Sequence, residues 1–435
     1  MTIFLIFSLL ASMNAHADKG YRLSLEDVKK FAIANNFRIK AADAEIQENR
    51  ARTEQRKSGL YPKLSLVLGP EIRQEDGRDS SVALAYAEMS WNIFRGSEDR
   101  IEVELSQLSE GIAESSRRRA QFELELEIEG LFYQYLSLSS KLSFYEEALD
   151  LNEKHRQLMR RKQSSGMASR ADLMEFALRE TYLRSEMSSI VQKQAEARLG
   201  LIRLMGPKVG TNFQPFGQVP HVHLKQDLSS FLERVNSTSE AVKSASLQAA
   251  AGAIAVKGAR AGWMPTLDAS ARYGSLPQDL AQTAPALDAS LVLRWQFFSG
   301  FETRGKIAEA RAKADRLNFE FKQKLLTAMT EAEVNYLKLG SIQERVHVEE
   351  GNEGKAKEYY AAVLEEYRRG LKNGYDLKSA EAYLLEARLR AADFTYEFID
   401  TKNRLERDVG IFIETQPHTE GSGAFRPDRK RIKDS

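Results

Sequence analysis

The sequence predicts a mainly α-helical fold with a small β part, built from two copies of one structural unit. Three observations support this. Two very long stretches contain no proline and carry apolar residues at helical spacing. Short segments alternate apolar and polar residues, as strands with one wet face do. Similar motifs also recur at an offset of 203 to 204 residues.

Composition excludes several classes of function. The chain has 435 residues, with 63 Lys+Arg against 62 Asp+Glu and a formal charge of +1. This balance argues against a nucleic-acid partner, which needs a basic excess or patch. The chain contains no cysteine. Disulfides, thiol nucleophiles, thiolate metal sites and a lipid-modified N-terminal cysteine are therefore excluded.

The N-terminus is typical of an exported protein. Residues 3–10 form an apolar core, and Ala15-His16-Ala17 has the small-x-small form of a cleavage site, so we expect residues 1–17 to be a signal peptide. The apolar core is too short to span a membrane, and no later stretch reaches 18 uncharged apolar residues. If the mature chain crosses a membrane, it must do so with β-strands.

Retained anchor residues reveal the duplication. The segment from Trp91 to Arg100 matches the segment from Trp295 to Arg304 in the pattern W-x-x-F-x-G-x-E-x-R. Further matches are Pro62 with Pro265, Gly166 with Gly370, Asp172 with Asp376 and Leu173 with Leu377. We therefore expect a first repeat over residues 18–205, a proline-containing linker over 206–227, a second repeat over 228–413 and a disordered polar tail over 414–435.

Each repeat follows one predicted order, beginning with a helix at Glu26–Gly59 or Leu228–Ala261. An aromatic residue and a proline then end the helix. Two strands follow, joined by a polar loop. The first strands are Leu64–Leu68 and Leu267–Tyr273, the second strands about Ser81–Phe94 and Leu287–Phe298, and the loops Glu71–Ser80 and Gly274–Ala286. A strand length of about 9 to 11 residues suits a tilted membrane strand.

A very long helix follows each pair of strands. The first runs from Ser97 to about Gln163, which corresponds to roughly 100 Å at ~1.5 Å per residue. Its apolar residues step by 4, 3 and 4, close to coiled-coil spacing. A turn near Gly166 or Gly370 then leads into a returning helix, Ala171–Met205 or Tyr375–Phe412.

The strand count predicts assembly with other copies. Four strands cannot close a membrane barrel, and an open edge in lipid leaves backbone groups unpaired. Three chains supply twelve strands, which is enough for a lumen, whereas eight strands leave an interior filled by side chains. We therefore expect a homotrimer with a 12-stranded transmembrane β-barrel, continued by an α-barrel of long antiparallel helices. Six aromatic residues at the helix-proximal strand ends predict a belt in contact with outer-membrane lipid: Tyr61, Trp91, Phe94, Trp263, Trp295 and Phe298.

The repeated order and its motifs resemble the TolC family of outer-membrane efflux and secretion channels. The motifs are the aromatic-Pro pair, W-x-x-F-x-G and G-x5-D-L, and the resemblance covers about Leu25 to Phe412. It implies an outer-membrane channel with a long periplasmic extension, which is a passive exit duct in a tripartite efflux pump or a type I secretion system. A periplasmic adaptor and an inner-membrane transporter are the implied partners.

The resemblance also implies roles for the helical turns. The turns would dock the adaptor through Gly166, Leu173, Gly370 and Leu377. By motif position, Asp172, Tyr367 and Lys372 would be gate partners, and Asp376 would face the lumen. A second acidic ring position of the family is Ser379 here, which departs from the family pattern.

Other functions are less well supported by the sequence. An elongated periplasmic or surface coiled-coil protein, structural or adhesive, is the main alternative, and the four alternating strands argue against it. Glycine followed by an aspartate also suits an ordinary helix end and helix start. We find no motif for a nucleophile, a phosphate loop or zinc, so we expect neither enzymatic activity nor a cofactor. His221 and His223 in the linker are too few to predict a metal site.

Overall fold

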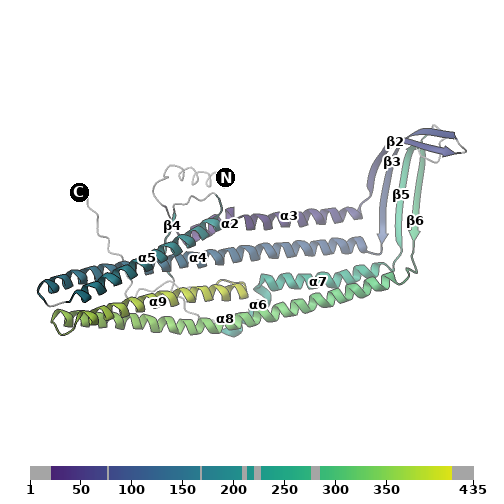
Figure 1. Cartoon of the computed structure of the whole chain (residues 1–435). Helices are drawn as coiled ribbons and strands as arrows, with labels where there is room; N and C mark the ends of the chain where they lie inside the picture. Colours follow the sequence, from purple (N-terminus) through teal and green to yellow (C-terminus); the bar gives the residue numbers. More distant parts are fainter. Residues whose placement is uncertain are drawn as a thin grey trace, which may run out of the picture. The chain divides into compact units, whose positions relative to one another are not determined.

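The computed structural model describes residues 21–75, 78–166, 169–207, 213–219, 227–275 and 285–413 (Figure 1). The expected signal peptide, the two linker histidines and the expected tail lie outside these residues. The chain divides into two compact units. We call residues 38–121 and 235–328 the strand unit, and the remainder, which includes 122–234 and 329–413, the helical unit.

The helices of the two repeats have matching lengths, and the predicted duplication is confirmed. Helices α4 and α8 have 67 residues each, and α5 and α9 have 36 each. The first repeat contains α2 (Leu25–Asn35), α3 (Phe37–Lys57), α4 (Glu98–Ser164) and α5 (Arg170–Met205). The second contains α6 (Leu228–Thr238), α7 (Glu240–Ala261), α8 (Glu302–Arg368) and α9 (Gly374–Val409).

The first helical segment of each repeat is broken, contrary to prediction. In the first repeat the break falls at Asn36, whose backbone is extended. The Asn36 side-chain amide donates to the Leu204 carbonyl oxygen at 2.7 Å, so the break is tied to the end of α5. In the second repeat the extended residue is Ser239. Both residues readily form local hydrogen bonds outside helices, which explains why they stand at breaks.

Four strands form one antiparallel sheet in the order β2-β3-β5-β6. The strands are β2 (Lys63–Glu75), β3 (Arg78–Arg95), β5 (Thr266–Ser275) and β6 (Ala286–Arg294). Residues Glu71–Ser80 were predicted to be a loop, but most of them continue the β2–β3 ladder, in which Gln74 pairs with Asp79. The first hairpin is therefore longer than predicted, with strands of 13 and 18 residues. Strand β6 is shorter than predicted and ends before Trp295.

The linker contains a strand that its proline content did not predict. Strand β4 (Phe213–Pro215) pairs in parallel with β1 (Tyr21–Leu23). The Phe213 side chain is fully buried, so this short strand is anchored in the helical unit. The linker therefore packs against the first repeat instead of only connecting the repeats.

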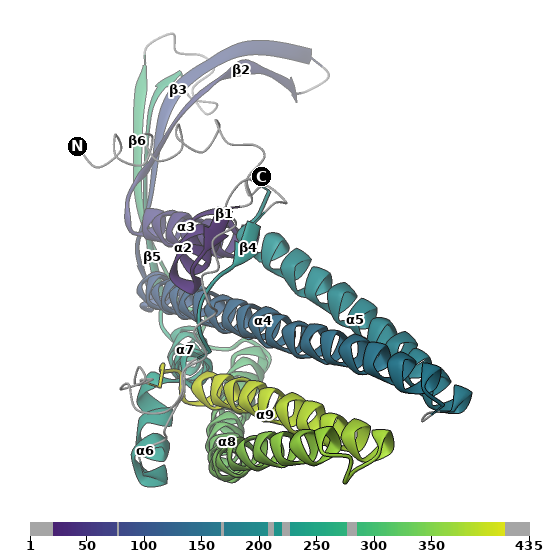
Figure 2. The ribbon, with the colours of Figure 1, turned by 90° about the vertical axis from the view of Figure 1, so that its left-hand side faces the viewer.

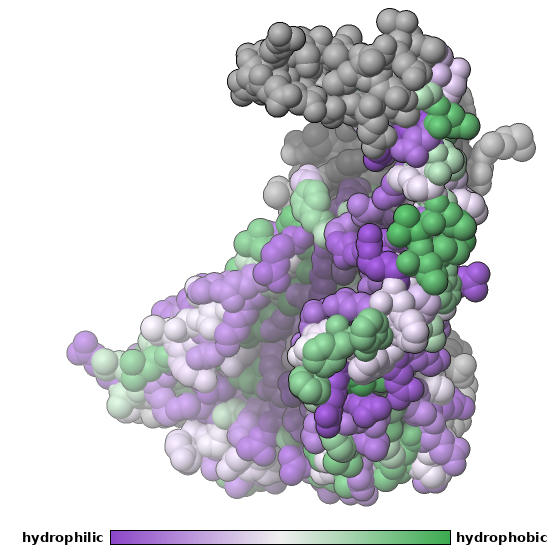
Figure 3. Space-filling model, turned by 90° about the vertical axis from the view of Figure 1, so that its right-hand side faces the viewer, coloured by the Kyte–Doolittle hydropathy of each residue, from purple (hydrophilic) through white to green (hydrophobic). Residues whose placement is uncertain are grey.

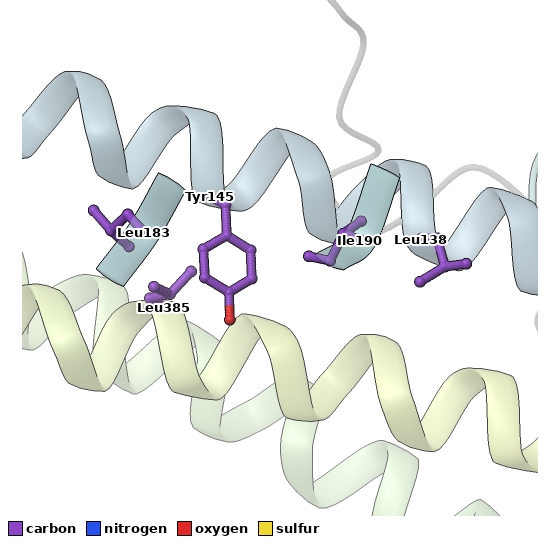
Figure 4. Packing of buried hydrophobic residues seen from close by; sticks show 5 residues of the cluster. All are labelled: Leu138, Tyr145, Leu183, Ile190 and Leu385. Carbon is purple, nitrogen blue, oxygen red and sulfur yellow. The ribbon is translucent and has the colours of Figure 1, made fainter. Parts of the chain in front are cut away.

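The core of the helical unit lies between helices of both repeats. Leu138 and Tyr145 of α4 meet Leu183 and Ile190 of α5, and Leu385 of α9 closes the cluster (Figure 4). Helix α9 also bonds to α8, where the Asn335 side-chain amide donates to Asp408 Oδ2 at 2.6 Å. Within this unit the helices therefore follow the order α5, α4, α9, α8 (Figure 2). No described helix is both long and apolar enough to cross a bilayer.

Helix α9 ends earlier than the predicted Phe412. Gly410 follows the last helical residue, Val409, with φ +79°, and its N–H donates to the Glu406 carbonyl oxygen at 2.7 Å. This left-handed cap is favourable for glycine and stops the helix.

Candidate channel wall and helical turns

The sheet of the strand unit separates apolar from polar side chains across all four strands. Register places Leu66 beside Ala87, Ala87 beside Tyr273, and Tyr273 beside Leu287. Paired residues share a face, so these four form one row of an apolar face. The other described members of that face are Leu64, Leu68, Ala85, Met89, Trp91, Leu267, Ala269, Ala271, Ala289, Leu291 and Leu293.

The opposite face of the sheet is mainly polar, although Val67, Leu84 and Val292 also lie on it. Glu88 Oε1 accepts from Arg272 Nε at 3.0 Å, and the hydroxyls of Ser270 and Ser290 lie 2.8 Å apart. Both contacts join neighbouring strands, so the polar residues stabilise the ladder across the sheet. Such a face suits water, and the apolar face does not.

The apolar face has no partner within the described residues. Leu64 is 81% exposed and Leu291 65% exposed. Figure 3 shows hydrophobic side chains on the surface of the strand region. The sheet also has two free edges, because β2 and β6 each pair with one strand. A sheet with an uncovered apolar face and two open edges is incomplete as an isolated piece of protein in water.

The predicted aromatic belt residues are all exposed: Tyr61, Trp91, Phe94, Trp263, Trp295 and Phe298. Two of them make the same contact in both repeats. Trp91 Nε1 donates to the Leu60 carbonyl oxygen at 3.3 Å, and Trp295 Nε1 donates to the Trp263 carbonyl oxygen at 3.2 Å. Each bond ties the end of a second strand to the residues just before the first strand. The indole nitrogen is thereby satisfied while the ring remains free to contact lipid.

The glycine of the W-x-x-F-x-G motif has a backbone role in both repeats. Gly96 and Ser97 have φ of +59° and +72°, and Gly300 and Phe301 have φ of +60° and +69°. Two successive left-handed residues turn the chain from each strand segment into the following long helix. The motif therefore specifies a tight turn, and its recurrence follows from the duplication.

The two helical turns contain the predicted docking residues. Gly166 and Gly370 have φ of +75° and +81°, and added Cβ atoms would meet nothing within 4 Å at either. The turn after α8 is closed by Leu371 N–H, which donates to the Glu366 carbonyl oxygen at 2.9 Å. Leu173 is half-buried, whereas Leu377 is only 1% exposed. Leu377 is therefore a core residue of its own turn in this single chain.

The predicted gate residues have different surroundings in the single chain. Tyr367 packs with Leu377 in a buried cluster that also includes Val363 and Ala380. Lys162 Nζ lies 4.1 Å from the centre of the Tyr367 ring, a cation–π contact that joins the C-terminal ends of α4 and α8 just before the two turns. Asp172 is in the first turn of α5, and its side chain lies outside the description. Lys372 is exposed and makes no ion pair within the described part of the chain.

Asp376 has a local role that the sequence also allowed. Its backbone N–H donates to Asn373 Oδ1 at 2.9 Å, and its Oδ2 accepts from the Asn373 N–H at 3.0 Å. This capping box begins α9. The side chain of Asp376 is thus held at the start of the helix within its own chain.

A buried charge network inside the helical unit was not predicted. Lys402 Nζ lies 3.0 Å from Glu129 Oε1 and 2.8 Å from Glu406 Oε1, and Lys29 Nζ lies 3.1 Å from Glu129 Oε2. Burial alone would raise the pKa of Glu129, but the charges of Lys402 and Lys29 hold it below its ordinary value. Burial raises the pKa of Glu406 to about 7, although Lys402 opposes the shift. Charged residues of α2, α4 and α9 therefore fix the packing of these helices.

A second buried pair lies nearer the turns. His155 Nδ1 of α4 contacts Glu381 Oε1 of α9, and both side chains are almost fully buried. Like the network at Lys402, this pair joins a helix of the first repeat to a helix of the second. The described residues contain no group of three or more side chains that could hold a metal ion.

Comparison with known proteins identifies the family. The sequence model of the outer membrane efflux protein family matches residues 30–207 and again residues 232–410, once in each repeat. The chain therefore belongs to the outer membrane efflux protein family. The predicted resemblance and the predicted outer-membrane location are confirmed at the level of this family.

Relatives of known structure share the fold of this family member. It is similar to the outer-membrane channel OprN, with a TM-score of 0.77, 18% identity and 89% coverage of both chains. It is also similar to the outer membrane protein VceC of Vibrio cholerae, with a TM-score of 0.78, 16% identity and coverage of 90% of this chain and 97% of that one. The Campylobacter jejuni CmeC outer membrane channel gives a TM-score of 0.77 at 14% identity, covering 89% and 85%.

A relative is also found by sequence. Protein CyaE of Bordetella pertussis is 23% identical over 313 residues, which cover 69% of this chain. The match spans 65% of the length of CyaE, somewhat less than two thirds.

Proposed function

We propose that this member of the outer membrane efflux protein family is a passive exit duct of an export system. Three copies would each contribute four strands to a closed transmembrane barrel of twelve strands. The polar face of the sheet would line a water-filled lumen and the apolar face would contact lipid. The cargo would arrive through an inner-membrane transporter and a periplasmic adaptor, in an efflux pump or a type I secretion system.

The amphipathic sheet is the observation that carries this proposal. Its apolar face is continuous across four strands and exposed, and its edges β2 and β6 are both free. Because the four strands alternate in direction, β6 of one copy can pair in an antiparallel sense with β2 of the next. Pairing of this kind satisfies the edge groups, which lipid would otherwise leave unpaired.

The helical turns are the proposed gate and docking surface. Gate partners are Asp172, Tyr367 and Lys372, with Asp376 toward the lumen, and the docking positions are Gly166, Leu173, Gly370 and Leu377. The contact of Lys162 with the Tyr367 ring supports a gate role, because it already joins the ends of α4 and α8 just before the two turns of one chain. Opening would separate these turns.

The alternative, an elongated coiled-coil protein of the periplasm or surface, is disfavoured by the sheet. A structural coiled coil has no need of an exposed apolar sheet face. We also propose that the chain is not an enzyme and has no cofactor, since the family is defined by efflux and export requires no reaction in the duct itself.

Fractionation and conductance test the function. We expect the mature protein in the outer membrane as a heat-modifiable oligomer that forms channels in a planar bilayer. A soluble, elongated protein without conductance would favour the coiled-coil alternative and overturn the proposal.

Point variants test the gate separately. Asp172→Ala and Tyr367→Phe should each raise the conductance of the purified channel, because each removes a side chain from the proposed closed turns. Unchanged conductance in both, with oligomers intact, would reject the gate assignment.

Gly370→Trp should abolish export without loss of assembly, and normal export in that variant would count against docking at this turn.

A further inference from the structure

The duplication allows contacts inside one chain to predict contacts between chains. In the helical unit, α4 of the first repeat packs against α9 of the second (Figure 4). Helix α8 is the repeat equivalent of α4, and α5 is the equivalent of α9. Within the helical unit α5 and α8 are the outer helices of the order α5, α4, α9, α8. If copies of the chain complete a ring, α8 of one copy meets α5 of the next as α4 meets α9.

The α4–α9 contact provides the template. Lys402 Nζ of α9 lies 3.0 Å from Glu129 Oε1 of α4, and Ser137 Oγ of α4 lies 3.5 Å from the Ala392 carbonyl oxygen of α9. Glu129, Ser137 and Lys402 are all buried. Both contacts therefore lie inside the packed interface between the repeats.

The repeat equivalents of these residues are chemically matched. At an offset of 204 residues, Glu129 corresponds to Glu333 of α8, and Lys402 corresponds to Arg198 of α5. Each charged residue of the template thus corresponds to a residue with a charge of the same sign. Ser137 corresponds to Ser341 of α8, and Ala392 to Ser188 of α5. The residues at these positions are small in both pairs, so that the two helices can approach closely.

The equivalents lack the surroundings that the template has. Glu333, Ser341 and Ser188 are exposed, and Glu333 makes no ion pair within the described ranges. Arg198 is half-buried, and its Nε is buried without a hydrogen-bond partner in the described structure. The buried Nε cannot reach another copy, so a contact of Arg198 with a neighbouring copy would have to use the terminal nitrogens of its guanidinium group.

Apolar residues on the same two helices show the same asymmetry. Leu337 and Val348 of α8 are 61% and 58% exposed. Their equivalents on α4, Tyr133 and Phe144, are half-buried in the lining of a cavity of about 220 Å³ with residues of α9. On α5, Leu199 is 56% exposed, whereas its equivalent on α9, Asn403, is buried. Helices α5 and α8 therefore each carry an uncovered face at positions that are covered in the template.

We infer that Glu333 of one copy forms an ion pair with Arg198 of the next, across the uncovered faces of α8 and α5. The inference rests on the proposed oligomeric duct, and it adds the register and the residues of the contact between copies. The occupant of each face is a second copy, because the template shows that this pair of helix types already packs in this register.

Engineered cysteines test the register directly, since the natural chain contains none. Ser341→Cys combined with Ser188→Cys should, after oxidation in isolated outer membranes, give covalent dimers and trimers in non-reducing gels, and reductant should remove them. The matched control is Ser137→Cys with Ala392→Cys, which should form a disulfide within one chain and leave a monomer. Each single cysteine variant should give no covalent trimer and should not reproduce the dimer and trimer bands of the double variant.

Charge reversal tests the ion pair. Glu333→Arg and Arg198→Glu should each cause loss of the heat-modifiable oligomer, and the double variant should restore it, because only the double variant places opposite charges together again. Failure of the double variant to improve on either single variant would overturn the ion pair.

The outcomes separate this inference from the proposed function. If oligomers and conductance are intact but the cysteines at positions 341 and 188 never link two copies, the inferred register is wrong and the proposed function is unaffected. If no oligomer and no conductance are found for the unmodified protein, the proposed function itself fails, and the inference fails with it.

Discussion

The sheet of this chain exposes many of its apolar side chains, whereas the helical bundle buries them. On the sheet, Leu64 is 81% exposed and Leu287 is 70% exposed. In the helical unit, Leu183 is fully buried and Leu377 is 1% exposed. The bundle buries its leucines against helices of the same chain, whereas the sheet presents them on a whole face. The environments of the two regions must therefore differ, and lipid is the environment in which an exposed leucine face is stable.

Charged residues differ between the two regions in the same way. The bundle contains Glu129, Lys402 and Glu406 in its interior, each paired with an opposite charge. On the sheet, the charged residues whose side chains are described lie on the polar face, as Arg272 and Glu88 do. The bundle tolerates charge where it is paired, and the apolar sheet face carries none. Three experiments test this difference between the two regions.

A charge on the apolar face should have the largest effect. Leu291→Arg places a guanidinium where the proposed barrel contacts lipid, at a cost of about 2–4 kcal/mol for each copy near the bilayer midplane. We expect the variant to be lost from the outer membrane, measured by fractionation and by the yield of heat-modifiable oligomer. Ser290→Arg is the matched control, because Ser290 lies next to Leu291 in the chain but on the polar face, and this variant should still insert. Equal insertion of both variants would show that the apolar face does not contact lipid.

Two features were visible in the sequence: the period of two in Leu287–Leu293 and the two unbroken helical stretches. The strand and the two long helices formed where these patterns predicted them. The extension of β2 was not visible. Pro70 and the polar residues after it are typical of a turn, yet Pro70 pairs with Ala83 in the ladder. In the single chain β2 is an edge strand, which tolerates proline because one side of its backbone has no strand partner. That β2 is an edge strand is known only from the topology.

The buried ion pairs were also beyond sequence reasoning. Carboxylates on long charged helices are usually solvated, and the sequence indicated nothing else for Glu129 or Glu381. Their burial depends on which helices pack together, and α4 and α9 are far apart in the chain. The contact of Lys162 with Tyr367 was missed for the same reason. The gate residues were predicted only from family motifs, and the local capping role of Asp376 shows how such a motif can also serve a helix start.

The junction between sheet and helices should show a smaller effect than a charge on the apolar face. Gly96 and Gly300 occupy equivalent turns with nearly equal φ, so alanine should cost about 1–2 kcal/mol of strain at either position. A Cβ atom on Gly96 would also lie 2.7 Å from the Ala261 carbonyl oxygen, whereas one on Gly300 meets nothing within 4 Å. We expect Gly96→Ala to lower the thermal midpoint of the oligomer more than Gly300→Ala. Equal midpoints would indicate that the first turn relaxes and that strain alone matters.

The paired charges of the bundle should make the stability of the folded chain depend on pH. The pKa of Glu406 is raised by burial from 4.5 to about 7, so the folded chain binds this proton more tightly than the unfolded chain does. Its contribution to stability is complete below pH 4.5 and is lost as the pH rises through 7. The amount is on the order of 3 kcal/mol for the full interval. Glu406→Gln keeps an acceptor for the Ile413 N–H but cannot titrate, so its thermal midpoint should change less between pH 5 and pH 7.5.

Glu344→Gln, which alters an exposed carboxyl on α8, is the control and should keep the pH dependence of the natural chain. If Glu406→Gln and Glu344→Gln gave the same slope of midpoint against pH, the Glu406 carboxyl would have to be ionised in the folded bundle throughout this range. The interior of the bundle would then stabilise a second full negative charge beside Glu129, with Lys402 and Lys29 together neutralising both. The two regions would then differ even more, because the bundle would contain two buried negative and two buried positive charges, while the apolar face of the sheet carries no charged residue.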